Sequence, residues 1–303
     1  MVLNIKKYRV YFRILIGIIY SFIALGAWGL ADFFIQRSAR IFGNWISLFY
    51  VTAFASIALL PFVYQDIIPL LLNTKALSLL VLLGIIVTIA SYIDFEALRI
   101  GKLSIVEPIY AFEIAVTASF AALVFGEVLS LYQGILIVLI FIGIFFISTS
   151  SFSSLKTITW EKGIGLAIIA TIGMGITNFL YGAGARITDP LLLNWFASTF
   201  IACICGIALI IRSEVQTMIS DLKTHHRLLF GVCVSDIVAW VAFSYATLSI
   251  PIAVATSISE SYIVIAVLLG LKINKERLKK HQVFGLILVI TAAIVLASIT
   301  KEL

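Results

Sequence analysis

The stretch Leu103–Glu127, LSIVEPIYAFEIAVTASFAALVFGE, decides the fold. Its composition predicts an apolar helix with a single carboxylate, Glu113, near its middle. The stretch Ile250–Glu276, IPIAVATSISESYIVIAVLLGLKINKE, repeats the pattern, and Glu260 follows Glu113 by 147 positions. Each stretch closes on a further glutamate. The pattern therefore indicates two related apolar helices, each carrying an acid far from its ends.

The composition of the whole chain favours the lipid bilayer as its solvent. Of its 303 residues 62% are hydrophobic and 12% are charged, with a mean hydropathy of +1.16, whereas soluble domains carry about 25% charged residues. The net charge of +6 lies in connectors, and no basic run alternates with aromatics as nucleic-acid binding would require. The three cysteines show neither metal nor disulfide spacing, so no cofactor is expected.

Ten stretches are long and apolar enough to span a membrane as helices, which takes about 20 residues. The longest connectors cover 150–162, 212–227 and 272–282, and the first of these, rich in serine, divides the chain into segments 1–150 and 151–303. The ten expected spans are Ile14–Gln36, Asn44–Tyr64, Ala76–Leu98, Leu103–Phe125, Ser130–Thr149, Gly163–Gly182, Leu191–Ile211, Leu228–Leu248, Ile250–Leu271 and Val283–Ser298.

The two segments are repeats of each other. GLADFFIQRSAR (Gly29–Arg40) aligns with GITNFLYGAGAR (Gly175–Arg186) at an offset of 146. Further matches follow in the same order, namely Asn44-Trp45 with Asn194-Trp195, Ala97 with Ala246, Glu113 with Glu260, and Glu127 with Glu276. Each copy has five expected spans, an odd number, so the second must enter the membrane upside down. The sequence thus predicts an all-α membrane protein built of two inverted five-helix repeats, an architecture whose substrate site lies at the repeat interface.

The orientation in the membrane is left open by the charges. Four basic residues precede the first span, which favours a cytoplasmic N-terminus, whereas the connector 272–282 carries five Lys/Arg on the face that would then lie outside. We follow the N-terminal signal and expect both termini inside the cell, in a multi-pass protein of the cell membrane. The chain is expected to act as a monomer or weak homodimer.

The repeats resemble the EamA-type family of the drug/metabolite transporter superfamily over nearly the whole chain. The resemblance is carried by an alanine near the end of the third helix, a mid-helix acid, a glutamate at a helix end and a Gln/Gly start of the next helix. These residues are Ala97, Glu113, Gly126-Glu127 and Gln133-Gly134 in the first copy, and Ala246, Glu260, Glu276, Gln282 and Gly285 in the second. The sequence departs from the family in having Ile114 and Ser261 where a proline often follows the acid. The resemblance implies ten helices, a path between the halves, and carriage of small metabolites, commonly outward.

Acids, but no bases, fall inside the expected spans. They are Asp32, Asp94, Glu96, Glu107, Glu113, Asp236 and Glu260, whereas all 21 Lys/Arg lie at span ends or in connectors. A charge at a helix centre costs roughly 2.5–3.5 kcal/mol on insertion scales. Such residues therefore face a cavity, find a partner or take a proton.

Glu113 and Glu260 are the strongest candidates for binding a substrate or a proton. Helical spacing puts Tyr110 and Thr117 on the face of Glu113, and it puts Thr256 and Ser257 on the face of Glu260. The alternative is a pair of symmetric structural groups, protonated and bonded to a neighbouring helix.

Two further acids have a tryptophan one turn away. Asp236 precedes Trp240, a combination that suits an amine. Asp32 follows Trp28, and its repeat partner is Asn178. The alternative for Asp32, which is expected near a helix end, is solvation at the membrane surface.

The remaining acids are expected nearer the membrane boundaries. Glu107, just before Pro108, is a candidate for the mouth of a substrate path. Glu96 is expected to pair with Arg99 one turn on, and Asp94 is interpreted as a boundary residue close to the same end.

The leading hypothesis is a secondary transporter that works by alternating access between the repeats. The acid excess favours a small cationic or zwitterionic cargo such as an amino acid or amine, exported in exchange for protons or another solute. The alternatives are an uptake carrier or exchanger for a nucleoside or sugar derivative, and a membrane scaffold that transports nothing. An intramembrane enzyme is disfavoured, because no Ser/His/Asp set and no histidine falls within a span.

Overall fold

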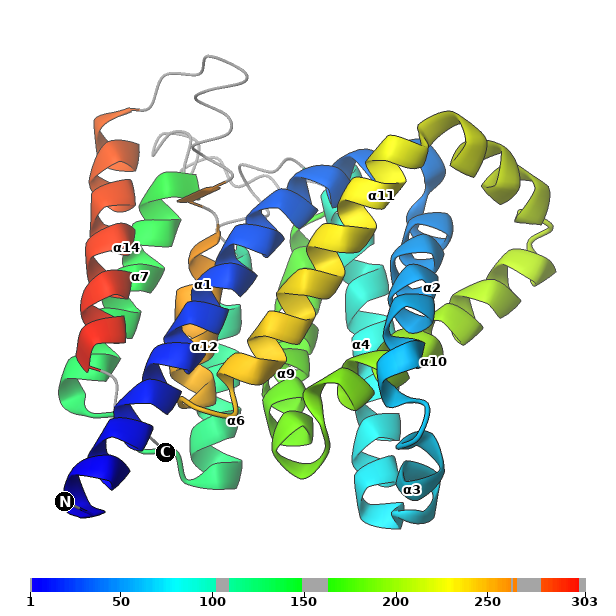
Figure 1. Ribbon diagram of the computed structural model, residues 1–303. Helices are drawn as coiled ribbons and strands as arrows, with labels where there is room; N and C mark the ends of the chain where they lie inside the picture. Colours follow the sequence, from blue (N-terminus) through cyan, green and yellow to red (C-terminus); the bar gives the residue numbers. More distant parts are fainter. Residues whose placement is uncertain (1, 102–108, 149–162, 263, 266–278, 300–303) are drawn as a thin grey trace.

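The computed structural model describes residues 2–101, 109–148, 163–262, 264–265 and 279–299. Within these ranges the chain forms helices and no strand (Figure 1). The elements are α1 (Val2–Phe42), α2 (Asn44–Val63), α3 (Ile67–Leu72), α4 (Thr74–Ile100), α6 (Glu113–Phe125), α7 (Leu131–Ser148), α9 (Ile164–Ile187), α10 (Pro190–Ile211), α11 (Val215–Ala246), α12 (Ile252–Ser259), the 3₁₀ helix η1 (Glu260–Tyr262) and α14 (Lys280–Ile299).

Seven of the described helices are long and apolar enough to cross a membrane. They are α1, α2, α4, α9, α10, α11 and α14, while α6 and α7 are shorter apolar helices. The expected spans 103–125 and 250–271 extend into residues outside the described ranges. The all-helical class is therefore confirmed for the described residues, and the count of ten spans stays a prediction.

The helices of the first half pack against those of the second. The main pairs are α1 with α11, α7 with α14, α2 with α10, and α4 with α9. The next pairs are smaller and include α6 with α9 and α1 with α12. Exchanging each helix for its repeat equivalent turns α1–α11 into α9–α4 and α6–α9 into α12–α1, and it returns α7–α14 and α2–α10 to themselves. This is the pairing that two repeats related by a twofold axis produce.

The two halves run in opposite directions. In Figure 1, α1 rises from the end of the molecule marked N, whereas its equivalent α9 descends towards that end. Helix α14 also finishes at the end where α1 begins (Figure 1). These directions agree with an inverted repeat.

The expectation that Glu113 lies mid-helix is wrong. Residues 111–112 form a turn, and Glu113 is the first residue of α6. The turn replaces regular helical bonds with a contact from the Phe112 amide to the Ile109 carbonyl at 3.1 Å. The Ile109 carbonyl also accepts from the Thr171 hydroxyl of α9 at 3.3 Å, so a tertiary contact stabilises the break.

The second expected helix is also interrupted at its acid. Helix α12 ends at Ser259, and Glu260 opens η1. The hydroxyl of Ser261 donates to the carbonyl of Ser257 at 2.9 Å, which satisfies an acceptor near the helix end. In each copy the glutamate therefore lies where a regular α-helix is interrupted, as in transporters with discontinuous helices.

The connector expected over 212–227 is largely helical, which corrects the sequence-based expectation. Helix α11 begins at Val215 and continues into the span through a kink at His225 (φ −123°, ψ 26°). The charged residues of this segment extend the helix beyond the apolar span, so their polarity was mistaken for a loop.

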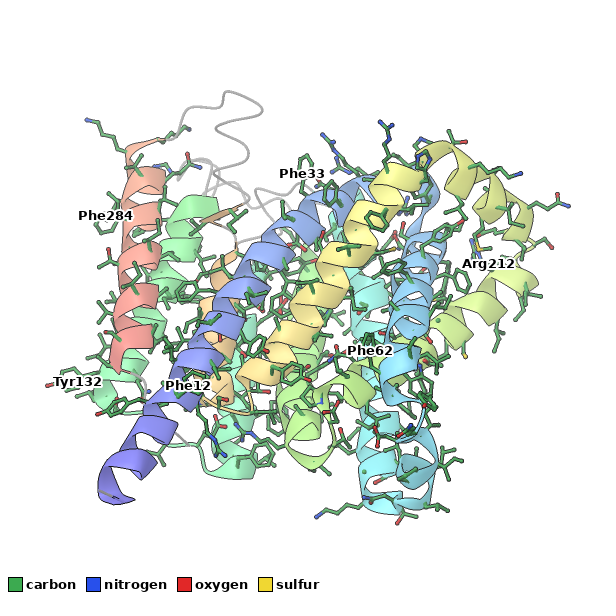
Figure 2. The ribbon with its side chains drawn as sticks, viewed as in Figure 1. Phe12, Phe33, Phe62, Tyr132, Arg212 and Phe284 are labelled. Carbon is green, nitrogen blue, oxygen red and sulfur yellow. The ribbon has the colours of Figure 1, made fainter. Side chains whose placement is uncertain are left out.

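Large apolar side chains cover the exterior. Phe12, Phe62 and Phe284 are 64%, 70% and 56% exposed, and in Figure 2 they lie on the outer surface of the helical assembly. A water-soluble protein rarely exposes such a large apolar surface, so this exterior suits contact with lipid.

Glycines on α9 allow neighbouring helices to approach closely. A Cβ at Gly175 would lie 2.6 Å from the Cβ of Val116 on α6, and one at Gly182 would lie 2.5 Å from Ile252 on α12. Close packing, rather than a nucleotide loop, therefore explains the glycines of this stretch.

Candidate functional site

Four carboxylates converge on one small cavity between the halves. The cavity has a volume of about 50 Å³ and is lined from α1, α4, the segment just before α6, the start of α6, α9, α11 and η1. We call it the acidic cavity, and its lining residues are Trp28, Asp32, Asp94, Leu98, Tyr110, Glu113, Met174, Asn178, Trp240, Glu260 and Tyr262.

Asn178 joins the two repeat-related glutamates. Its Nδ2 atom lies 3.5 Å from Glu113 Oε2 and 3.3 Å from Glu260 Oε1. The three residues are 1%, 6% and 8% exposed, respectively. The Oδ1 atom of Asn178 is buried and has no hydrogen-bond partner within the described part of the chain. One acceptor in the cavity is thus available to a donor from a ligand.

Asp32 and Asp94 lie on the same cavity, each beside a tyrosine. The Tyr262 hydroxyl donates to the Asp32 carboxylate. The Tyr110 hydroxyl donates to the backbone carbonyl of Asp94 at 3.3 Å and also lies beside the Asp94 carboxyl group. Because α1 continues to Phe42, Asp32 is well inside its helix rather than at the expected end. Asp94 is likewise not a boundary residue, since it lines the cavity.

Asp236 faces a second cavity of about 40 Å³, which we call the Asp236 cavity. Thr52, Ser91 and Tyr181 are among its lining residues, and Trp240 lines both cavities. The Trp240 indole lies near the Asp236 carboxylate. Trp240 is therefore a lining residue that the two cavities share.

The charged side chains described around the two cavities are all acidic. Asp32 is close enough to Asp94, Asp236 and Glu260 for their charges to interact. Among the described residues that line the two cavities there is no lysine, arginine or histidine. The arrangement can attract and hold a cation or protons, and it would repel an anion.

A second constellation ties the halves together away from the cavities. Arg186 on α9 forms a 2.6 Å ion pair with Glu127, which follows the left-handed Gly126 at the end of α6. The same carboxylate accepts from the backbone N–H of Ile252 at 3.0 Å, at the start of α12. The helix-end glutamate of the motif thus caps a helix of the other half.

The glutamine of the motif caps its own helix. The Ser130 amide donates to Gln133 Oε1 at 2.9 Å, and the Gln133 amide donates to Ser130 Oγ at 3.3 Å, a capping box at the start of α7. In the second half the Lys279 amide donates to Gln282 Oε1 at 3.0 Å. These motif residues start helices and do not contact the cavities.

The structure places eight of the candidate binding residues on the two cavities, whereas Thr117 and Thr256 line neither cavity. Trp28, Asp32, Tyr110, Glu113, Asn178, Trp240 and Glu260 line the acidic cavity, and Asp236 lines its neighbour. Glu107 lies outside the described residues. The expected Glu96–Arg99 pair is confirmed at 2.7 Å.

Sequence reasoning missed Tyr262, Met174 and the role of Asp94 in lining the cavity. The helical spacing of Asp94 and Leu98, four residues apart, puts both on one face, and both line the cavity. Tyr262 carried no signal in the sequence, because its contact with Asp32 depends on how η1 packs against α1.

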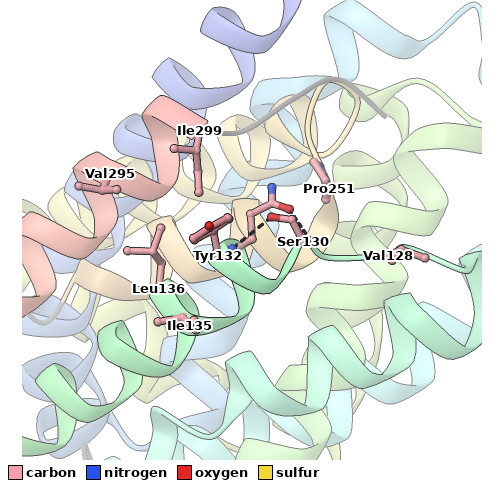
Figure 3. A pocket seen from close by; sticks show the side chains of 9 residues that line it. Val128, Ser130, Tyr132, Ile135, Leu136, Pro251, Val295 and Ile299 are labelled. Carbon is pink, nitrogen blue, oxygen red and sulfur yellow. Dashed lines mark hydrogen bonds between the residues drawn. The ribbon is translucent and has the colours of Figure 1, made fainter.

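A larger pocket lies outside the acidic region. It measures about 720 Å³ and is lined by the start of α7, the end of α14 and Pro251, as Figure 3 shows. Its nine lining residues include no charged side chain. It offers no group that would select a charged substrate.

Comparison with known proteins identifies a matching family and a solved structure with a similar fold. The model of the EamA-like transporter family matches residues 15–149 and 161–298. No curated protein matches the chain. A solved structure described only as "Crystal structure of protein" superposes with a TM-score of 0.65 at 12% identity, over 92% of this chain and 95% of its own. At that identity the likeness shows the fold alone.

Proposed function

Since the chain belongs to the EamA-like transporter family, and is thus a multi-pass membrane transporter, we propose that it moves a small cationic or zwitterionic metabolite by alternating access between its repeats. The acidic cavity is the proposed binding site. Glu113 and Glu260 are proposed to bind the cargo. Asp32 and Asp94 are proposed to add to the negative charge of the site.

One observation carries this proposal. Two glutamates related by the internal repeat come from opposite halves and meet at Asn178, in a cavity that both halves enclose. Charges held at membrane depth mark transport paths and proton relays. A site divided between the halves changes whenever one half moves against the other, which is what alternating access requires.

The direction and coupling are finer parts of the proposal. We propose export, in which protons or a second solute compete with the cargo for Glu113 and Glu260. The support for proton coupling is the absence of a base among the described lining residues. Without a bound cargo, the carboxylates of the site then need protons to neutralise them.

The test is transport of labelled amines and amino acids into proteoliposomes that contain the purified protein. Glu113→Gln and Glu260→Gln are expected to lower the transport rate at least tenfold, because each loses a charge-assisted bond worth roughly 1.5–3 kcal/mol. Glu214→Gln is the matched control, since Glu214 pairs with Arg212 at the surface. Undiminished transport in both cavity variants would remove these glutamates from the mechanism.

Coupling is tested in the same vesicles. An imposed proton gradient is expected to drive accumulation of the cargo in the wild type. If the gradient has no effect while exchange of labelled for unlabelled cargo proceeds, proton coupling is rejected and obligatory exchange is retained.

A further inference from the structure

The two cavities share one aromatic wall. Trp240 stacks on Tyr181 with ring centroids 4.3 Å apart and meets Trp28 edge-on at 5.0 Å. Trp240 lines both the acidic cavity and the Asp236 cavity. A ligand that occupied both would run along the faces and edges of these rings, which also attract cations.

The charges of the two cavities exceed what one positive group can balance. Five carboxylates line them, and their described lining residues include no base. A cargo with one positive charge leaves four carboxylates to be neutralised by protons. A zwitterion would add a sixth carboxylate, with no cationic side chain among the described lining residues to receive it.

The size of each cavity matches a head group rather than a whole metabolite. Their volumes are about 50 and 40 Å³, room for a few water-sized groups, whereas pockets for drug-sized ligands measure roughly 300–1,000 Å³. An ammonium group is close to water in size. Each cavity can therefore hold one such head.

Each cavity also offers acceptors for N–H donors. In the acidic cavity the buried Oδ1 of Asn178 has no partner among the residues that the structure describes, and Asn178 lines the same space as Glu113 and Glu260. In the Asp236 cavity the Thr52 hydroxyl donates to the Leu48 carbonyl at 2.7 Å, so its oxygen presents lone pairs beside the carboxylate.

We propose that the cargo is an elongated dication without a carboxylate, with one ammonium head at Glu113, Glu260 and Asn178 and the other at Asp236. The chain between the heads passes Trp240. This inference rests on the proposed function and narrows its substrate class to diamines and their longer relatives. Asp236 is then the residue that distinguishes diamines from monoamines.

The test compares three probes of equal chain length: pentane-1,5-diamine, pentylamine and 5-aminopentanoate. Binding is measured by calorimetry on the purified full chain, and transport is measured in proteoliposomes. We expect the diamine to bind at least tenfold more tightly than pentylamine, and 5-aminopentanoate to bind more weakly than either. Diamines of three to eight carbons then give the length that best spans Trp240.

A pair of variants isolates the second head. Asp236→Asn is expected to reduce diamine affinity about tenfold, the loss of one charge-assisted contact, while pentylamine affinity changes less than twofold. Asp66→Asn is the control, because Asp66 lies at the exposed start of α3. The wild-type probe series decides the question even if Asp236→Asn does not fold.

The outcomes separate the inference from the function on which it rests. Equal affinities for diamine and monoamine, or tight binding of 5-aminopentanoate, overturn the dication while leaving a transporter of monoamines or amino acids. Failure of all three probes and of the wider amine and amino acid set to be transported counts against the proposed function itself.

Discussion

Asn178 and Asp32 occupy equivalent positions of the two repeats but differ in charge. At Asn178 the side chain lies within 3.5 Å of two glutamates, where an aspartate would add a third carboxylate at contact distance. An amide donates to both glutamates and adds no charge. The difference in charge between the two repeat-related residues therefore follows from where each residue lies in the cavity.

Replacing Asn178 with leucine is expected to destabilise the protein by about 1–3 kcal/mol. Leucine has the same branching pattern as asparagine but removes the donor that two buried carboxylates share, and leaving buried polar groups unsatisfied costs this much. Thermal unfolding in detergent measures the change.

The adjacent residue gives the control for that experiment. Thr177 is 0% exposed and its hydroxyl has no partner in the described ranges, so Thr177→Val should leave stability unchanged or raise it. Equal losses in the two variants would show that the packing of α9, and not the hydrogen bonds of Asn178, controls the effect.

Most of the residues that line the cavity could be predicted from the sequence, whereas the backbone conformation at Glu113 could not. Acids inside apolar stretches are costly, so they mark the site directly in the sequence. The turn before Glu113 depends on Thr171, 62 positions away from Ile109, and such a contact has no local signal.

At the scale of helices, the approach of α9 to α6 depends on Gly175. Gly175→Leu is expected to lower stability by about 1–3 kcal/mol through overpacking, because a Cβ there would lie 2.6 Å from Val116 and 3.1 Å from the Glu113 carbonyl. Transport should fall as well, since the glutamate would move with α6. Gly165→Leu on the same helix meets nothing within 4 Å and should change neither property.

The Glu127–Arg186 ion pair is expected to stabilise the folded protein more than a surface ion pair does. Their side chains are 5% and 20% exposed, and removing one partner of a buried pair costs roughly 3–5 kcal/mol. Glu127→Ala should therefore unfold at a clearly lower temperature than the wild type.

The exposed pair Arg212–Glu214 is the reference for this measurement. Its side chains are 54% and 32% exposed, and surface pairs contribute about 0–1 kcal/mol. Glu214→Ala should thus have little effect. A loss as large as that of Glu127→Ala would mean that the two pairs do not differ in strength.

At the scale of the molecule, the pairing of helices across the halves explains why both repeats are needed. Helices α1 and α4 find their main partners, α11 and α9, in the other half, and the cavity is lined from both. Neither half alone could enclose the acids. A relative movement of the halves would then open the cavity to one side or the other.

The inverted arrangement makes a prediction that is independent of substrate. Gln65, after the second expected span, and Thr217, after the seventh, occupy corresponding connectors, so inversion puts them on opposite sides of the membrane. In a background without the three native cysteines, Gln65→Cys and Thr217→Cys should react with a membrane-impermeant maleimide from opposite sides of sealed vesicles. Both residues are exposed, so low reactivity would not reflect burial. Labelling of both from one side would mean that the halves insert in parallel, and it would remove the twofold relation on which a shared, alternately opened cavity depends.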